Sequence, residues 1–200
     1  MLIERDLPLA VPDLVAAAFG SFPAGHGQAH AAVQHFLYDR LVGALRELGY
    51  TAQEVDAVIA LRPPRWGELP RRLAAVRAFA ALPESAALAS ANKRVGNILK
   101  KAEGDAVPEA VATALLQEPA EQALAATLAQ VAPQADAAFA QGDYTASLQA
   151  LAALKAPVDV FFDAVMVNAD DPALRRNRLA LLAQLQRAMN RVADLSRLAA

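Results

Sequence analysis

Apolar residues recur along this chain every three or four positions, which is the spacing of one face of an α-helix. The clearest stripe lies between residues 28 and 48 and consists of Val33, Phe36, Leu37, Leu41, Leu45 and Leu48. Alternating runs of β-branched residues, which would indicate half-buried strands, are missing. The pattern therefore predicts an all-α chain.

Proline and glycine mark the expected helix boundaries, because proline is tolerated in a first turn and glycine is favoured just after a last one. The residues in such positions are Pro12, Pro83, Pro108, Pro119, Pro172, Gly20, Gly49 and Gly142. Thr51 and Glu54 have the spacing of a capping box. These signals predict helices over about 12–19, 28–48, 51–62, 67–82, 83–102, 108–117, 119–140, 143–155, 157–168 and from 172 towards the C-terminus.

Composition supports a folded helical protein. Hydrophobic residues, mostly alanine and leucine, make up 56% of the 200 residues, and aromatic residues make up 6%. No stretch has the roughly 18 uncharged apolar residues of a membrane span. We divide the chain into a helical lead-in, 1–50, and a helical bundle, 51–200.

Two further features bear on the cellular compartment. The chain has no cysteine, which excludes disulfides and thiolate chemistry and is compatible with a reducing environment. Glu4, Arg5 and Asp6 stand where a signal peptide would have its apolar region. We therefore expect a cytoplasmic protein.

No residue pattern predicts a catalytic centre or a metal site. His26, His30 and His35 are the only histidines, and no carboxylate completes a metal-binding set with them, so we expect them at the surface. Nucleotide-binding glycine loops and hydrolase motifs are missing, and Asp170-Asp171 is better explained as a helix N-cap. We expect neither a metal nor a cofactor in this chain.

Charge is unevenly distributed although the net charge is only −2. Segment 62–101 has nine basic and two acidic residues, and 171–200 has six and two, whereas 102–170 has one and ten. Two basic helices could pack together into one patch that binds nucleic acid. Alternatively, basic and acidic segments could neutralise each other within the fold, and the charges alone do not decide between these arrangements.

Helical geometry places five polar residues on one face of the expected helix 83–102. At 100° per residue, Lys93, Arg94, Asn97, Lys100 and Lys101 share an arc of about 120°. The apolar residues opposite are Ala91, Val95, Ile98 and Leu99. Four cations around one amide suit a phosphate backbone and a base or sugar edge. A solvated face near a helix C-terminus would have the same composition.

The last helix repeats this division with one exception. Arg176, Arg187 and Arg191 lie opposite its apolar arc, where they could bind RNA, but Arg178 projects into that arc. An unpaired guanidinium would be costly there, so a carboxylate should accompany it. Asp163, on the preceding amphipathic segment, is the nearest candidate, and we expect the two to form a structural clamp.

Four stretches of the sequence resemble one known family. They are Leu-Ala-Ser-Ala-Asn-Lys-Arg-Val-Gly-Asn-Ile-Leu-Lys-Lys (88–101), Leu-Leu-Gln-Glu-Pro-Ala-Glu-Gln-Ala-Leu (115–124), Asp-Val-Phe-Phe-Asp-Ala-Val-Met-Val (159–167) and Asp-Pro-Ala-Leu-Arg-Arg-Asn-Arg-Leu-Ala-Leu-Leu (171–182). They are similar to the C-terminal region of the β subunit of bacterial tetrameric glycyl-tRNA synthetases. The resemblance covers residues 36–198, and 3–9 are similar to the family's lead-in.

The resemblance implies an anticodon-binding helical bundle of the DALR type, shared with arginyl-tRNA synthetase. Asp171, Ala173, Leu174 and Arg175 match the namesake motif, with Pro172 inserted. Family members are much longer, so we expect Met1 to correspond to a position inside their chains rather than to their first residue. Two residues depart from the family: Asn168 replaces a bulky apolar residue and Arg176 replaces an asparagine, which makes Arg176 a weaker candidate for binding tRNA.

The implied partners are tRNA(Gly), the α subunit, which holds the ATP-dependent adenylation site, and the rest of the β subunit. Neither DNA nor a membrane is implied. The chain would thus be a tRNA-binding part of glycine–tRNA ligase without a catalytic site of its own. Two other hypotheses remain: a helical module that only assembles the synthetase, and an independent enzyme, which the missing site chemistry disfavours.

Overall fold

The computed structural model describes residues 1–23, 29–102 and 107–199. This part of the chain is all-α, as predicted, and its only extended pairing is one isolated bridge between Ala10 and Arg65. The α-helices are α1 (Val11–Gly20), α2 (His30–Glu47), α3 (Ala52–Ile59), α4 (Leu69–Ala80), α5 (Ser85–Lys101), α6 (Pro119–Ala140), α7 (Tyr144–Ala150), α8 (Lys155–Ala164) and α9 (Pro172–Met189).

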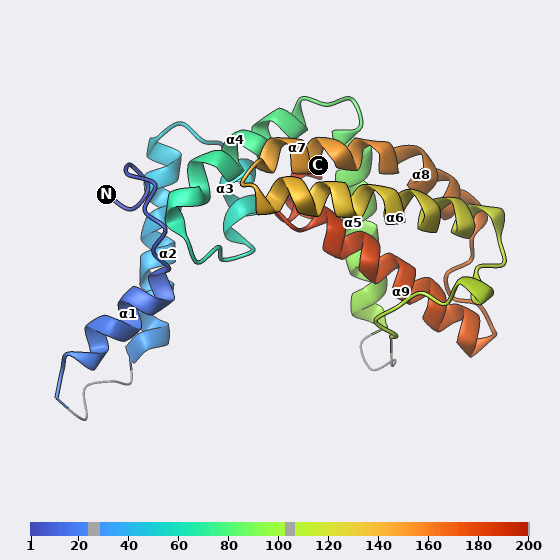
Figure 1. Cartoon of the computed structure of the whole chain (residues 1–200), viewed down its shortest axis with the longest axis horizontal. Coiled ribbons are helices and arrows are strands. Elements are labelled where there is room, and N and C mark those ends of the chain that lie inside the picture. Colours follow the sequence, from blue (N-terminus) through green and yellow to red (C-terminus); the bar gives the residue numbers. More distant parts are fainter. Residues whose placement is uncertain (24–28, 103–106, 200) are drawn as a thin grey trace.

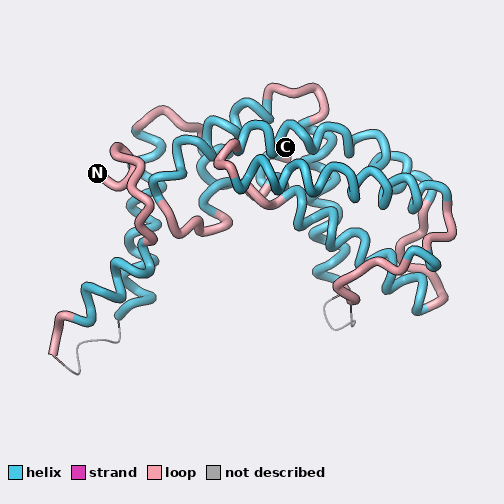
Figure 2. The backbone as a smooth tube through the Cα atoms, in the orientation of Figure 1, coloured by secondary structure: helices cyan, strands magenta, loops and turns pink. Residues whose placement is uncertain are grey.

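The helices form an arch. Figure 1 shows α6, α7 and α8 running along its top, with α9 crossing beneath them and packing against α5. The hairpin of α1 and α2 extends from the other end, next to α3, and forms the second limb in Figure 2. The α5–α9 pair and the α1–α2 hairpin are therefore at opposite ends of the molecule.

One hydrophobic core joins the helices of the bundle. Phe79 of α4, Leu124 of α6 and Phe161 of α8 are fully buried in it, as are Leu148 of α7 and Leu181 of α9. The many alanines around them allow helices to approach closely, because a methyl group is the whole side chain. This core holds α5 and α9 in fixed positions.

Across the described residues, no single helix has both the length and the hydropathy needed to cross a membrane. The segments Trp66–Ala80 and Ser85–Lys101 meet that test only as a pair, across a bend of 109°.

The local capping signals are confirmed. The amide of Glu54 donates to Thr51 Oγ1 (3.2 Å), and the amide of Thr51 donates to Glu54 Oε2 (2.8 Å), which completes the capping box of α3. Asp171 caps α9 by accepting from the amide of Ala173 (2.7 Å). Gly49 follows α2 with a φ of 89°, a conformation that glycine adopts at little cost.

The predicted helix 108–117 is wrong. This segment is irregular apart from one 3-10 turn, Thr113–Leu115. The side chain of Asn177, buried in α9, accepts from the amide of Ala112 (2.7 Å) and donates to its carbonyl (3.1 Å). Since these contacts satisfy the backbone groups that a helix would pair, the segment is held extended against α9.

Replacing Asn177 by alanine should release this segment from α9. Both backbone groups of Ala112 would lose their partner, which we expect to cost about 1 to 3 kcal/mol of unfolding free energy. Hydrogen exchange at the Ala112 amide should become faster. The matched control is Asn168→Ala, because Asn168 is exposed and makes no hydrogen bond to a described residue. Unchanged exchange at Ala112 would contradict the contact.

Other predicted boundaries shift through packing. The helix predicted over 67–82 begins as a 3-10 turn, Trp66–Glu68, and that over 143–155 changes to a 3-10 turn at Leu151–Leu154. The helix predicted over 157–168 ends at Ala164, because the next residues are extended and the Met166 carbonyl accepts from Arg178.

The apolar stripe predicted for α2 is only partly buried. Leu41 and Leu45 are buried, but Phe36 and Leu48 are 55% and 67% exposed. Tyr38, buried beside these two leucines, also fixes the helix, because its hydroxyl donates to the carbonyl of Pro63 (2.9 Å). Only one side of α2 therefore meets the bundle.

An ion pair between α3 and α4 gives a testable pH dependence. Arg77 Nε donates to Glu54 Oε1 (2.6 Å), and this bond lowers the pKa of Glu54 from its ordinary value of 4.5. A lowered folded-state pKa contributes stability above pH 4.5 that is lost as the pH falls through the folded value. In Arg77→Met, the free energy of unfolding should therefore decrease less as the pH falls below 4.5. The control Arg46→Met should leave this pH dependence unchanged.

Candidate nucleic-acid interface

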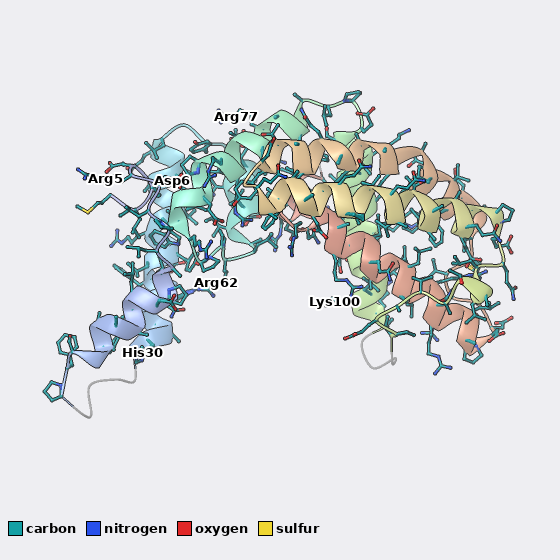
Figure 3. All side chains as sticks on the ribbon, viewed as in Figure 1. Arg5, Asp6, His30, Arg62, Arg77 and Lys100 are labelled. Atoms are coloured by element: carbon teal, nitrogen blue, oxygen red, sulfur yellow. The ribbon has the colours of Figure 1, made fainter. Side chains whose placement is uncertain are left out.

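The polar face predicted for α5 is exposed. Val95 is buried and Ile98 and Leu99 are half-buried, which fixes the helix on the core. The five exposed residues are Lys93, Arg94, Asn97, Lys100 and Lys101. Figure 3 labels Lys100, on the limb of the arch that α5 forms. We call these five residues the α5 face.

The cations of the α5 face are not neutralised by the described part of the chain. No described carboxylate lies within 4.0 Å of Lys93, Arg94, Lys100 or Lys101. The guanidinium of Arg94 lies 4.1 Å from the ring centroid of Phe162 in α8, a cation–π contact that orients it without removing its charge. The face thus presents positive charge to solvent.

The three arginines of α4 are paired with carboxylates inside the fold. Arg72 bonds Glu68 (3.1 Å) and Arg77 bonds Glu54, while Arg71 lies 3.4 Å from Asp6. Internal neutralisation therefore accounts for the α4 arginines. It does not account for the α5 face.

Helix α9 packs directly against α5. Asn92 Nδ2, in a buried side chain, donates to Asn190 Oδ1 (2.7 Å). Gly96 allows the close approach, since a Cβ there would lie 3.2 Å from Nε2 of Gln186. The two basic helices are thus neighbours.

The cations predicted for the last helix have other neighbours than the α5 face, and Arg191 lies beyond the end of α9 at Met189 rather than on its face. Arg187 Nη2 donates weakly to the carbonyl of Glu109 (3.4 Å). Arg191 pairs with Asp136 of α6 (3.2 Å). The exposed Arg176 donates to the carbonyl of Pro172 in its own helix (3.2 Å). Contact between these arginines and RNA remains a prediction.

Arg178 is buried as predicted, but its expected partner is wrong. Arg178 Nε donates to Glu121 Oε1 (2.6 Å), and its Nη1 donates to the carbonyl of Met166 (2.8 Å). Asp163 is exposed on α8. The side chain of Glu121 is fully buried. Arg178 stays beside this carboxylate because separating the pair would leave an uncompensated charge in the core.

The sequence did not single out Glu121 as the partner of Arg178, and the structure shows that this residue has a second, local role. Its Oε2 accepts from the amides of Gln117 (2.9 Å) and Glu118 (2.8 Å) at the start of α6. The spacing of Glu118 and Glu121 is that of a capping box, and this signal was available in the sequence. One carboxylate therefore caps α6 and neutralises α9.

The two described histidines make separate contacts. His30 lies against Phe19, with ring centroids 4.1 Å apart, and His35 is 3.5 Å from Asp39 at the surface. His26 lies outside the described residues. In the described ranges, no group of three or more His, Cys, Asp or Glu residues could hold a metal ion.

Comparison with known proteins identifies the class. Residues 88–196, which include most of α5 and all of α9, match the model of the DALR anticodon-binding domain. The chain belongs to this family, as the resemblance predicted.

The chain is also similar to particular subunits along its whole length. It is 66% identical over 201 residues to the glycine–tRNA ligase beta subunit of Thiobacillus denitrificans, and 66% identical over 200 residues to that of Leptothrix cholodnii. The beta subunit of Janthinobacterium is 63% identical over 200 residues. Each comparison covers all of this chain and 28% of the relative.

Proposed function

We propose that this chain is the anticodon-binding part of a glycine–tRNA ligase β subunit and that it binds the anticodon stem-loop of tRNA(Gly) through the α5 face. The observation that carries this proposal is the group of four cations around Asn97 that no described carboxylate neutralises. Lysine and arginine bind backbone phosphates, while an amide can both donate to and accept from a base edge. The matched family supports the same ligand.

In this proposal, the chain binds tRNA and does not catalyse the reaction. The ATP-dependent attachment of glycine would belong to the complete cytoplasmic enzyme, with the α subunit and the rest of the β subunit as partners. Residues 51–200 would form the binding bundle, and 1–50 would form the lead-in.

Binding of tRNA(Gly) should weaken steeply with salt. In a plot of the logarithm of the binding constant against the logarithm of the salt concentration, each neutralised phosphate contributes a slope of roughly −0.7 to −0.9. Four cations should therefore give a slope of about −3. A gel shift with tRNA(Gly), repeated at several salt concentrations and with a tRNA of altered anticodon, measures this. Binding that is independent of salt would contradict the proposal.

An apolar surface on the α1–α2 hairpin favours a second function, assembly of the synthetase. Phe22 and Phe36 are 58% and 55% exposed. Between the two helices lies an apolar hollow of about 230 Å³, with Phe19, Leu37 and Trp66 in its lining. Such surfaces commonly contact other proteins. If assembly alone were the function, Phe36→Ser would impair joining of the subunits and neutralising the α5 face would leave tRNA binding unchanged.

A further inference from the structure

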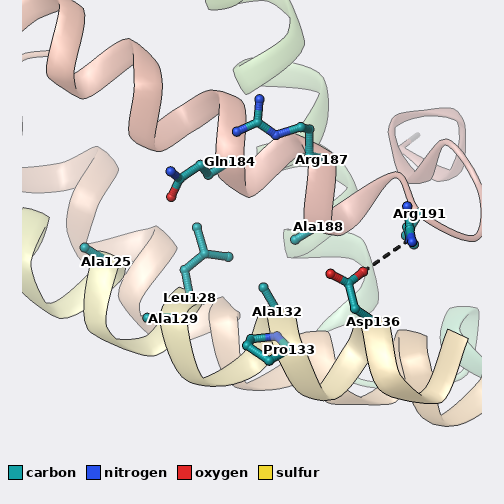
Figure 4. Close-up of a pocket in the computed structure, with 10 residues that line it drawn as sticks. All are labelled: Ala125, Leu128, Ala129, Ala132, Pro133, Asp136, Gln184, Arg187, Ala188 and Arg191. Carbon is teal, nitrogen blue, oxygen red and sulfur yellow. Dashed lines mark ion pairs between the residues drawn. The ribbon is translucent and has the colours of Figure 1, made fainter. Parts of the chain in front are cut away.

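A groove of about 430 Å³ runs between α6 and α9. Figure 4 shows apolar residues of α6 along one side, among them Leu128, Ala129 and Ala132, with Gln184 and Arg187 of α9 across from them. The ion pair of Arg191 with Asp136 lies at one end. The groove thus combines an apolar wall with a cationic one.

We propose that this groove holds one unpaired nucleotide of the bound RNA, an inference that rests on the proposed function. The base would lie on the apolar wall of α6, Gln184 would bond its edge, and Arg187 would bind its phosphate. A glutamine amide can donate and accept at once, which suits a base edge. The α5 face would bind mainly backbone phosphates, with Asn97 at one base edge, whereas this groove would sense whether a base is present.

The polar groups of the groove are available to a ligand. Arg187 is exposed, and its contact with the Glu109 carbonyl is long at 3.4 Å. Gln184 Nε2 reaches the same carbonyl at 3.5 Å. No described carboxylate pairs with Arg187. Both side chains can therefore turn to a nucleotide at the cost of weak bonds only.

The wall of α6 offers one further polar group. Pro133, inside the helix and lining the groove, has no amide hydrogen for the carbonyl of Ala129, the residue four positions before it. That carbonyl can accept from an amino group of a base.

The size and charge of the groove favour a nucleotide over a peptide. A volume of about 430 Å³ is at the lower end of the range for small-molecule sites, which is enough for one nucleotide. The pair of Arg191 and Asp136 is about half exposed on both sides, so a phosphate could replace the aspartate at little cost.

Filling the groove tests the proposal. Ala129→Leu places a larger apolar side chain in the groove without changing a charge, and Ala126→Leu, on the same helix but outside the groove, is the matched control. The probe is a synthetic anticodon stem-loop of tRNA(Gly), made with an intact loop or with abasic loop nucleotides. Ala129→Leu should weaken binding of the intact loop about tenfold and leave the abasic loop unchanged.

Gln184→Leu gives the second arm and should narrow the difference in affinity between the intact and abasic loops. If Ala129→Leu and Gln184→Leu bind both probes as the unmodified chain does, the nucleotide proposal is wrong. The proposed function then still stands as long as binding depends on salt and on the α5 face. If the unmodified chain binds neither probe, the proposed function itself fails.

Discussion

Replacing Arg178 by alanine should lower the free energy of unfolding by about 3 to 5 kcal/mol. The substitution leaves the carboxyl group of Glu121 fully buried without its cation, and it removes the donor to the Met166 carbonyl. For a chain of 200 residues, the melting temperature should fall by roughly 10 °C. Urea unfolding and a thermal melt measure both quantities.

Two controls separate this effect from a general loss of charge. Arg176→Ala removes an exposed arginine from the same helix, and Asp163→Asn alters the carboxylate that sequence proximity suggested. Neither should change stability by more than about 0.5 kcal/mol. The double variant Arg178→Met with Glu121→Gln should recover part of the lost stability, because no ionisable carboxyl is left without its cation and the amide oxygen of the glutamine can still accept from the amides at the start of α6. A normal melt of Arg178→Ala with lost tRNA binding would overturn the structural role.

Neutralising Lys93 and Arg94 together should weaken tRNA(Gly) binding by about ten- to a hundredfold at low salt. Two phosphate contacts would be lost, so the magnitude of the salt slope should fall by about 1.5. The fold should survive, because neither side chain is buried or ion-paired to a described residue. Gel shifts over a salt series measure the slope, and circular dichroism checks the fold.

The other substitutions of this series test individual roles. Asn97→Ala should chiefly narrow the difference between the cognate and the altered anticodon, because an amide reads bases rather than charge. Arg40→Ala with Arg46→Ala removes two exposed cations from α2 and should have little effect. If Arg187→Ala with Arg191→Ala is silent while the α5 pair abolishes binding, α9 is a scaffold only.

Local signals predicted much of the fold. Helix α6 begins at Pro119 and ends at Ala140, as its proline and periodicity indicated, and the capping box of Thr51 and Glu54 forms as its spacing required. These features depend on residues within one turn of each other. Such contacts are present in the sequence as fixed intervals.

Long-range contacts account for the errors. Segment 108–117 has a helix-like start at Pro108, but the bonds of Ala112 come from Asn177, 65 positions later. Arg178 required a carboxylate, and burial in the core gave it one 57 positions away rather than the one 15 positions away. Spacing indicates that a partner must exist, whereas only packing decides which residue it is.

The candidate site divides in the same way. The α5 face was predictable because helical geometry alone determines which side chains share a face. The groove of α6 and α9 was not, because it depends on how two helices distant in sequence pack. Arg187 and Arg191 were identified as exposed cations, but their position beside an alanine-rich wall emerged from the fold alone.

The small net negative charge of the chain affects how it meets a polyanion. At long range, a chain with a net charge of −2 does not attract RNA. At physiological salt, the positive charges of the α5 face act over only about 8 Å. Asp163 of α8 is exposed and pairs with no described cation, so collisions in which it leads are repelled. If the chain binds RNA as proposed, productive encounters are those in which α5 leads, and the association rate should be limited by rotation of the chain rather than raised by electrostatic steering.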